Sequence, residues 1–595
     1  MNLKKQNPWL VGAAAAVFSL CSYVGFFFRD NLSTSLQSTL ILSLLFGLFF
    51  FSFRADWFYR KLRLCWLLAL FLGGMYALGK CLFAGAPLTG RQLLRTLALS
   101  TLGFSALYYL AVKLLFHLVA SAPFSFRRRS VLAFFDRHPL SGVFCLMFLL
   151  WLPHLILKYP SGMNWDSLDS MSVGLGIAED VYNQPVIYTL ILTAFLKLGV
   201  AMGNPNLGIF IPSALAMPLL ALAVADCYKL ETELGAADWA KLLTLLFFGF
   251  SPFVVGYVGV CIKDVPYMIA LLFWLTALIR CCLLHDRFWC SWRQPAQLLL
   301  SAVFVVAFRS NGQYVLIPTL LLLLVLELKR RRALSGQRLA GRVACLLLAC
   351  LLPSLTVSAV TAVTGSHKPS PREALALPFQ QTARLAAEHP EQIRPEEAEI
   401  IDRLLDFDSL AEDYNPDTVD PVKLKYNESA TGADLAAYLK VWFRQFFRAP
   451  SCYVKATLAQ NYYLFYPEYS NYYYYYSCVH HDFVGPDSSI HIGSPALVSD
   501  VWGYYYQPLF RQAHELPLLY LVNNMTTYIF LFLALLCFTC TKKDWALLPV
   551  LLPVFLSLAI IVVAPCIKNH VRYAFPVIYS VPLLFAVYSS RIKTE

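Results

Sequence analysis

Apolar residues follow one another in long runs along most of this chain, and most runs are close to the length of a membrane-crossing helix. About 20 helical residues cross the ~30 Å hydrocarbon core of a bilayer. The sequence therefore predicts an all-α, multi-pass membrane protein with about fourteen transmembrane helices. The expected spans are 9–28, 36–53, 62–84, 93–118, 139–158, 207–228, 240–260, 265–284, 296–309, 312–328, 343–364, 517–540, 545–565 and 573–590.

Short basic clusters between the runs predict the orientation, because Lys and Arg collect in cytoplasmic loops. The basic clusters alternate with the apolar runs so that both termini are expected to be cytoplasmic. These clusters are Lys4 with Lys5, residues 127–129 and residues 329–332. This alternation holds only if segment 185–203 does not cross completely. We expect that segment to form a re-entrant or interfacial helix pair, which is tolerated where protein covers it.

One loop is unusually acidic. Four carboxylates, Asp166 and Asp169 among them, fall within residues 159–185, directly after an apolar run. The alternation of basic clusters places this loop outside the cell. Because burying an unpaired carboxylate costs several kcal/mol, carboxylates at a membrane boundary indicate chemistry or a bound cation.

The composition changes abruptly after residue 364, where about 150 residues rich in Pro, Asp, Glu and Tyr contain no spanning run. A segment of this length can form a domain of its own. We expect its first half to be α-rich and its tyrosine-rich second half to be irregular, and its position outside the cell follows from the same alternation. The predicted parts are an N-terminal four-helix module (1–138), a membrane core that includes the acidic outer loop (139–364), an extracytoplasmic domain (365–515) and C-terminal helices (516–595).

Composition excludes the soluble classes, because 58% of the 595 residues are apolar and only 14% are charged. The net charge of +12 could indicate nucleic acid, but the basic residues form short clusters between apolar runs rather than one basic face. The lipid bilayer, and not nucleic acid, is therefore the expected partner. Most of the sixteen cysteines lie in apolar runs and read as core residues, although Cys452 and Cys478 could form one bridge.

Four sets of polar residues interrupt apolar runs at helix ends. These are Asp166 with Asp169, Lys263 with Asp264, Arg309 with Asn311, and Lys568 with His570 and Arg572. The expected topology brings all four sets to one face, and charges at membrane depth are too costly to gather there by chance. Carboxylates beside guanidinium and ammonium groups describe a site that activates a nucleophile and holds an anionic, phosphorylated group.

The order of elements in this part of the chain resembles the GT-C superfamily. An inside-to-outside helix comes first, then an outer loop that carries Asp and ends in an aromatic-polar-Pro sequence, and then an apolar helix. Protein mannosyltransferases and the lipid A aminoarabinose transferase are members of that superfamily, whose loop Asp is usually followed by His-Pro-Pro. Here Asn183-Gln184-Pro185 stands at that position. The chain looks more like a bacterial family of uncharacterised GT-C-like membrane proteins. The motifs that carry this likeness are YPSGMNWDS, IKDVPY, FRSNGQY, LPFQQTAR and KNHVRYAFP, in this order between about residues 140 and 590.

The resemblance implies a glycosyltransferase that moves a sugar, with inversion, from a polyprenyl-phosphate donor to a cell-envelope acceptor. The acceptor would be a glycan, lipid or protein at the outer face of a bacterial cell membrane. Asp166 becomes the general-base candidate, with Asp169 as its rival. The candidates for binding the leaving phosphate are Lys263, Arg309, Arg572 and Lys568, and the supporting residues are Asp264, Asn311, Gln184 and His570.

Each residue also has a plainer interpretation. Asp169 could cap a short helix and Asp166 could be an ordinary loop acid, while Lys263 with Asp264 could be a helix-boundary pair whose lysine reaches for the interface. His570, His480 and His481 read as surface histidines, and Tyr472–Tyr476 as an interfacial aromatic belt or a platform for sugar rings. No cofactor is expected, although Asp166, Asp169 and Asp264 could ligate a divalent metal ion.

Two other functions remain open. A transporter or flippase of a lipid-linked or anionic solute would line its pathway with the same charges, and a polysaccharide polymerase or ligase would use a similar donor. Transporters typically contain internal repeats with paired broken helices. No such repeat is evident in this sequence, and the polar groups collect at one surface, so an enzyme is the favoured prediction.

Overall fold

The computed structural model describes residues 8–27, 36–54, 63–83, 90–121, 132–179, 184–330, 335–366, 370–469, 480–485, 489–564, 567–568 and 570–592. Within these residues, ten helices are long and apolar enough to cross a membrane. They confirm an all-α, multi-pass membrane protein, while the count of fourteen stays a prediction. The ten are Pro8–Phe27, Arg63–Phe83, Gly90–Val119, Pro205–Glu233, Asp264–Leu283, Ser310–Lys329, Gly336–Thr364, Met525–Lys542, Trp545–Val563 and Val571–Arg591.

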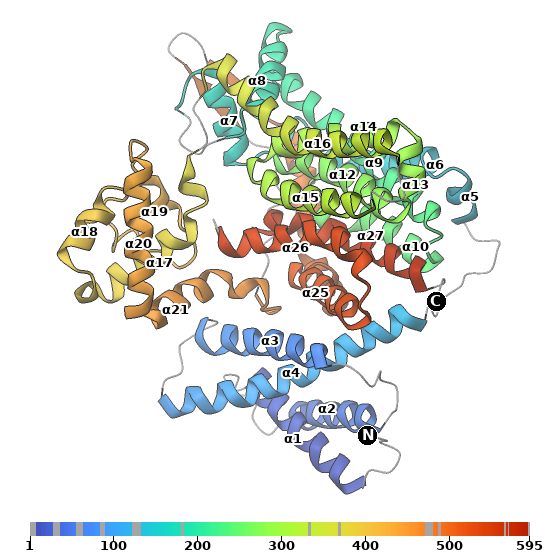
Figure 1. Cartoon of the computed structure of the whole chain (residues 1–595), viewed down its shortest axis with the longest axis vertical. Helices are drawn as coiled ribbons and strands as arrows, with labels where there is room; N and C mark the ends of the chain where they lie inside the picture. Colours follow the sequence, from blue (N-terminus) through green and yellow to red (C-terminus); the bar gives the residue numbers. More distant parts are fainter. Residues whose placement is uncertain are drawn as a thin grey trace.

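The first four helices form a layer of their own, beneath the main bundle in Figure 1. They are α1 (Pro8–Phe27), α2 (Leu36–Arg54), α3 (Arg63–Leu78, extended by a π-turn, Gly79–Phe83) and α4 (Gly90–Ser121). Small residues let the backbones of these helices approach closely. A Cβ added to Gly103 in α4 would lie only 2.3 Å from the backbone nitrogen of Ser22 in α1. Through α3 and α4 the layer contacts α25 (Met525–Lys542).

The main bundle surrounds two helices that are almost completely buried, α12 (Asp264–Leu283) and α27 (Phe575–Ile592). Because these two helices lie at the centre, polar residues at their ends come together in the middle of the bundle. The surrounding elements are α5 (Leu132–Arg137), α6 (Ser141–Ile156), α9 (Pro205–Glu233), α10 (Asp238–Phe250), α13 (His285–Cys290), α14 (Arg293–Phe308), α15 (Gln313–Lys329), α16 (Gly336–Thr364) and α26 (Leu548–Val563).

The prediction of one continuous span over 240–260 is wrong. α10 ends at Phe250, and only the single turn α11 (Pro252–Val255) follows before the chain becomes extended and Val260 pairs with Gly162. Proline has no N–H to donate and its ring obstructs the preceding turn, so Pro252 interrupts the helix. The break delivers Lys263 and Asp264 to the start of α12.

A buried lysine compensates this break. Lys158, which follows α6, is fully buried, and its ammonium donates to the carbonyls of Val255, Gly256 and Val258 at 3.3, 2.5 and 2.7 Å. These carbonyls have left the regular helical pattern, and non-helical backbone at membrane depth needs partners from the protein. One side chain therefore holds the broken segment against the end of α6.

Residues 371–461 form a helical unit with its own apolar core, which includes Phe379, Leu404 and Tyr438. Figure 1 shows this unit at one end of the bundle. Its predicted α-rich character is confirmed, while its position outside the cell stays a prediction. The helices are α17 (Ala376–Glu388), α18 (Pro395–Asp402), α19 (Asp420–Leu424), α20 (Gly432–Arg448) and α21 (Pro450–Asn461).

A β-hairpin, β1 (His481–Val484) with β2 (Ser489–Ile492), packs on α7 (Trp165–Leu175) and α8 (Val186–Ala201). With 16 residues, α8 is about 24 Å long at 1.5 Å per residue, shorter than a hydrocarbon core. α8 is one continuous helix, so the expected helix pair within 185–203 is wrong, while its incomplete crossing of the membrane stays a prediction. The remaining helices are α22 (Ala496–Val501), continued by a π-turn (Trp502–Tyr506), α23 (Gln507–Glu515) and α24 (Pro517–Val522). Asn183, Tyr472–Tyr476 and Cys478 lie outside the described residues.

Candidate functional site

Members of all four predicted sets meet in one cluster of opposite charges. Asp166 Oδ2 lies 2.5 Å from Arg572 Nη1 and 3.7 Å from Lys263 Nζ. Asp264 Oδ1 lies 2.8 Å from Arg309 Nη1, and Asp264 Oδ2 lies 3.4 Å from Arg572 Nη1. The predicted convergence of these residues is confirmed, although they are separated by up to about 400 positions in sequence.

The start of α7 places the two candidate bases. Asn164 caps this helix by accepting from the Ser167 backbone N–H at 3.1 Å, so Asp169 is not the cap. Asp166 lies in the first turn, where the positive end of the helix dipole favours a carboxylate. Asp169 lies one turn further on and accepts from Gln184 Nε2 at 3.2 Å.

Gln184 connects the two carboxylates through its two amide atoms. While its nitrogen donates to Asp169, its oxygen accepts from Lys263 Nζ at 3.0 Å, and Lys263 in turn faces Asp166. Gln184 stands where the resembling family carries the first proline of His-Pro-Pro. In this chain the position is a polar bridge that orients Lys263.

Asp264 anchors the cations. Its side chain is 1% exposed and stands at the first residue of α12, between two guanidinium groups. A buried carboxylate of this kind is tolerated only with charge partners. Asp264 Oδ1 accepts no hydrogen bond from any described residue, so the 2.8 Å approach of Arg309 is an ion pair without hydrogen-bond geometry. The Arg309 N–H groups are therefore not committed to Asp264.

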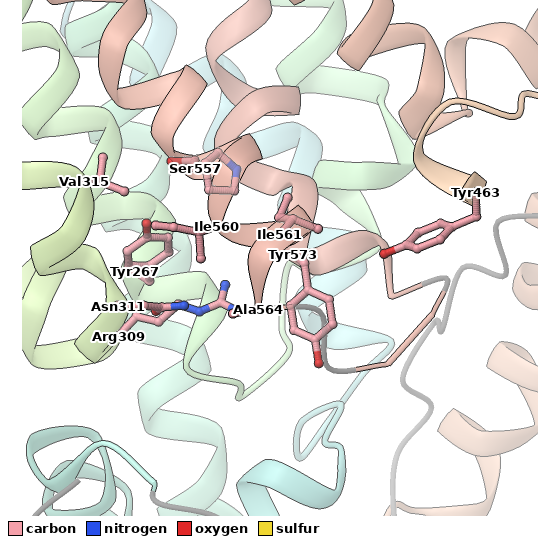
Figure 2. Close-up of a pocket in the computed structure, with 11 residues that line it drawn as sticks. Tyr267, Arg309, Asn311, Val315, Tyr463, Ser557, Ile560, Ile561, Ala564 and Tyr573 are labelled. Carbon is pink, nitrogen blue, oxygen red and sulfur yellow. The ribbon is translucent and has the colours of Figure 1, made fainter. Parts of the chain in front are cut away.

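Arg309 lines a small cavity of about 60 Å³ together with Asn311 (Figure 2). The guanidinium carbon lies 5.7 Å from the ring centre of Tyr267 and 5.4 Å from that of Tyr573. Aromatic faces attract a guanidinium and hold its plane, while the N–H edges stay available for an anion. Tyr463, from the segment after α21, stands at the far side of the same cavity.

The electrostatics of the cluster keep Asp166 ionised. Burial alone raises the pKa of this carboxyl, but Lys263 and Arg572 outweigh it and hold the pKa well below its ordinary value. Asp166 is consequently a weak base while both cations face it. Burial and the charge of Arg572 lower the pKa of His570 to about 4, so this imidazole is neutral at pH 7.

Lys568 does not join the cluster. Its ammonium lies 2.6 Å from Asp417 Oδ1 and faces the rings of Tyr462 and Tyr469 at 4.7 and 5.6 Å. Its backbone N–H also donates to the Asp417 carbonyl at 2.8 Å. Lys568 therefore joins the helical unit 371–461 to the rim of the site, rather than standing where Arg572 and Lys263 meet.

Sequence reasoning missed two features near the cluster. Lys158 reads in the sequence as a lysine that ends an apolar run, and nothing there indicates that three carbonyls and the ring of Trp502, at 5.3 Å, surround it. The second is an apolar cavity of about 700 Å³ between α8, α9, α12 and α14. Its lining includes Cys261 and Ile262, which directly precede Lys263, and reaches Trp292 and Arg293 at the other end of α14.

The arrangement offers side-chain cations rather than a cluster of metal ligands. In the part of the chain that the structure describes, no group of three or more His, Cys, Asp or Glu side chains is placed to hold a metal ion. Asp166 and Asp264 each face a cation, and Asp169 is bound by Gln184.

Residues 181–594 match a family described as a family of unknown function, DUF6020. The match covers well over half of the chain. The chain belongs to the DUF6020 family. The part that matches includes Lys263, Asp264, Arg309 and Arg572, whereas α7 with its two aspartates and the N-terminal module precede it. No curated protein and no solved structure matches this chain.

Proposed function

We propose that this protein is a membrane glycosyltransferase that moves a sugar from a polyprenyl-phosphate donor to a cell-envelope acceptor, as the GT-C resemblance implies. One observation carries the proposal: a cluster of side-chain cations and carboxylates stands directly beside a large apolar cavity. A lipid phosphate needs both features, because its charge requires cations and its chain requires a channel without polar groups.

In the proposed complex the donor phosphate binds Lys263, Arg309 and Arg572. The hydrocarbon chain enters the cavity past Cys261 and Ile262. Negative charge grows on the phosphate as it leaves the sugar, and cations fixed in advance stabilise that change. Tyr267 and Tyr573 keep the Arg309 guanidinium in place for this purpose.

The proposed step is a single displacement. An acceptor hydroxyl oxygen forms a bond to the anomeric carbon, the bond from that carbon to the phosphate oxygen breaks, and its electron pair stays on the phosphate. The hydroxyl proton goes to a carboxylate of α7. The side-chain cations supply the positive charge at the phosphate, so no step is assigned to a metal ion.

Asp166 is the first candidate for this base, and donor binding would activate it. Arg572 and Lys263 hold its pKa well below the ordinary value in the free protein. A donor phosphate competes for the same two cations, which weakens their hold on Asp166 and makes it a stronger base. Asp169, one turn away and bound to Gln184, is the rival candidate.

A second function is favoured by the extent of the cavity. It runs along α14 from the neighbourhood of Lys263 to Arg293, so it has a basic residue near each end. A flippase of a lipid-linked anion would use such a path. A polymerase or ligase would share the donor site and differ only in the acceptor.

The test is transfer of labelled sugar from polyprenyl-phosphate donors in proteoliposomes. We expect Asp166→Asn to lower the rate about 10²- to 10⁴-fold, the usual contribution of a positioned general base. Asp544→Asn is the matched control, because it removes a carboxylate that pairs with Arg591 at 2.7 Å elsewhere in the molecule. Protein-dependent movement of labelled carrier across the bilayer, without transfer from any donor, would overturn the enzyme in favour of the flippase.

A further inference from the structure

The β-hairpin has two faces of opposite character. Asp482 pairs with His491 across the strands, and Phe483 pairs with Ile490. Phe483 and Ile492 point inward, 2% and 0% exposed, and pack against α7 and α8. Side chains alternate along a strand, so Asp482 and His491 share the opposite, outward face. The residues of this outward face have no role in the mechanism proposed above.

One further step of the same register places His480 opposite Gly493 on the outward face. Because Gly493 has no side chain, the His480 ring lies directly over its Cα. A Cβ on this residue would lie 2.5 Å from His480 Nδ1 and 3.1 Å from His491 Nε2. The two imidazole nitrogens therefore lie over the same residue, each within about 3 Å of the position that a Cβ of Gly493 would take.

Gly493 and His491 are both held in place. Asn206, in α9, binds the Gly493 backbone twice, donating to its carbonyl at 2.9 Å and accepting from its N–H at 3.0 Å. His491 Nδ1 lies 2.6 Å from Asp482 Oδ1. A carboxylate only accepts, so Nδ1 carries the proton and Nε2 of the neutral ring presents its lone pair toward His480.

We propose that His480 and His491 bind a divalent transition-metal ion of the zinc and copper class. Neutral imidazoles suit these ions, with metal–nitrogen distances of about 2.0–2.1 Å, and a ligating histidine typically donates its other N–H to a carboxylate as His491 does. With two protein ligands, water completes the coordination. The ion links the two strands of a hairpin whose buried face packs on α7.

The test uses the full-length protein without a polyhistidine tag, purified in detergent. Zn²⁺ is titrated in competition with a chromophoric chelator, and Cu²⁺ binding is followed by the nitrogen couplings in its electron paramagnetic resonance spectrum. We expect one equivalent of ion bound through two imidazoles. His480→Ala and His491→Ala abolish this equivalent, and Asp482→Asn weakens it about 10- to 100-fold, the usual effect of losing an orienting carboxylate.

Two further variants make the result specific. Gly493→Ala keeps both histidines, but its methyl group would collide with the His480 ring and displace it, so this variant should also lose the ion. His389→Ala is the matched control, because this histidine stands beside a carboxylate, Glu391 at 3.4 Å, in a different part of the protein. The proposal is wrong if the wild-type protein binds no ion, or if the bound equivalent persists in both His480→Ala and His491→Ala.

Discussion

Helix α12 carries a buried ion cluster at each end, and the two clusters are completed to different degrees. At its last turn, Arg280 Nη2 and Nη1 lie 2.9 and 3.0 Å from the two oxygens of Asp226, and Nε lies 2.8 Å from Glu233 Oε2. Thr276 and Gln297 also donate to Asp226, at 2.6 and 2.9 Å. All three guanidinium nitrogens and both carboxylate oxygens of this pair are thereby bonded.

The cluster at the first residue of α12 is left incomplete. Asp264 Oδ1 has no hydrogen bond from the described residues, Lys263 stands 3.7 Å from Asp166, and a cavity adjoins Arg309. A closed network leaves no donor for a ligand, whereas an open one gains stabilisation when an anion completes it. The Arg280 cluster therefore has the character of structural support, whereas the open Asp166 cluster is where we propose that a phosphate binds.

The largest effect on stability is expected at the closed cluster. Arg280→Met leaves the buried Asp226 without its cation, and removing one partner of a buried pair costs about 3–5 kcal/mol. Arg330→Met is the control, because the Arg330 side chain is 47% exposed and pairs with Glu327 only at 3.4 Å. This variant should cost less than about 1 kcal/mol. Thermal unfolding in detergent measures both. Equal stability of the two variants would show that the Arg280 network is not a support.

At the open cluster the expected effect is on function. Arg309→Met should lower sugar transfer about 10²- to 10³-fold, the usual cost of removing one group that stabilises developing charge. Arg572 still faces Asp264 in this variant, so unfolding should change by less than for Arg280→Met. Arg309→Lys keeps the charge but loses the planar fork, and we expect an intermediate rate. A rate unchanged in Arg309→Met would remove this residue from the donor site.

Hydropathy and helix-end charges predicted much of this architecture. Asp166, Lys263, Asp264, Arg309 and Arg572 stand out in the sequence because charge at a membrane boundary is costly, and the same cost forces them together in the fold. The sequence therefore indicates which residues form the cluster. It does not indicate which carboxylate faces which cation, because that choice depends on how the helix ends meet.

The features that the sequence did not predict depend on packing between distant segments. The break at Pro252 falls inside an apolar run, and its compensation by Lys158 joins residues about 100 positions apart. The apolar cavity is a space between four helices whose residues look like any others that face lipid. Lys568 was grouped with Arg572 by its closeness in sequence, but Asp417 draws it to the rim.

The pH dependence of stability tests the charge balance around His570. Its pKa falls from an ordinary 6.5 to about 4 in the fold, so between these values the unfolded chain binds more protons. Stability is therefore expected to fall as the pH decreases from about 6.5 to about 4, by at most about 3 kcal/mol. His570→Gln should flatten the curve in this window. The depressed pKa of Asp166 acts separately, since its contribution is complete above about 4 and is lost only below that.

The smallest expected effect concerns Lys158, which binds the carbonyls of the segment that precedes Lys263. Lys158→Met keeps the length of the side chain but removes the donors for three carbonyls. We expect the free energy of unfolding to fall by about 1–3 kcal/mol. The fall is limited because the variant no longer buries a charged ammonium group, which offsets part of the cost of the lost hydrogen bonds. The carbonyls belong to the segment that delivers Lys263, so donor binding should weaken as well. Lys241→Met is a matched control, since this lysine is also buried but pairs with Asp136 at 2.8 Å, away from the site. If both variants lose stability yet bind the donor like the wild-type protein, Lys158 only repairs the broken helix, and the position of Lys263 is set by Gln184 and Asp166 alone.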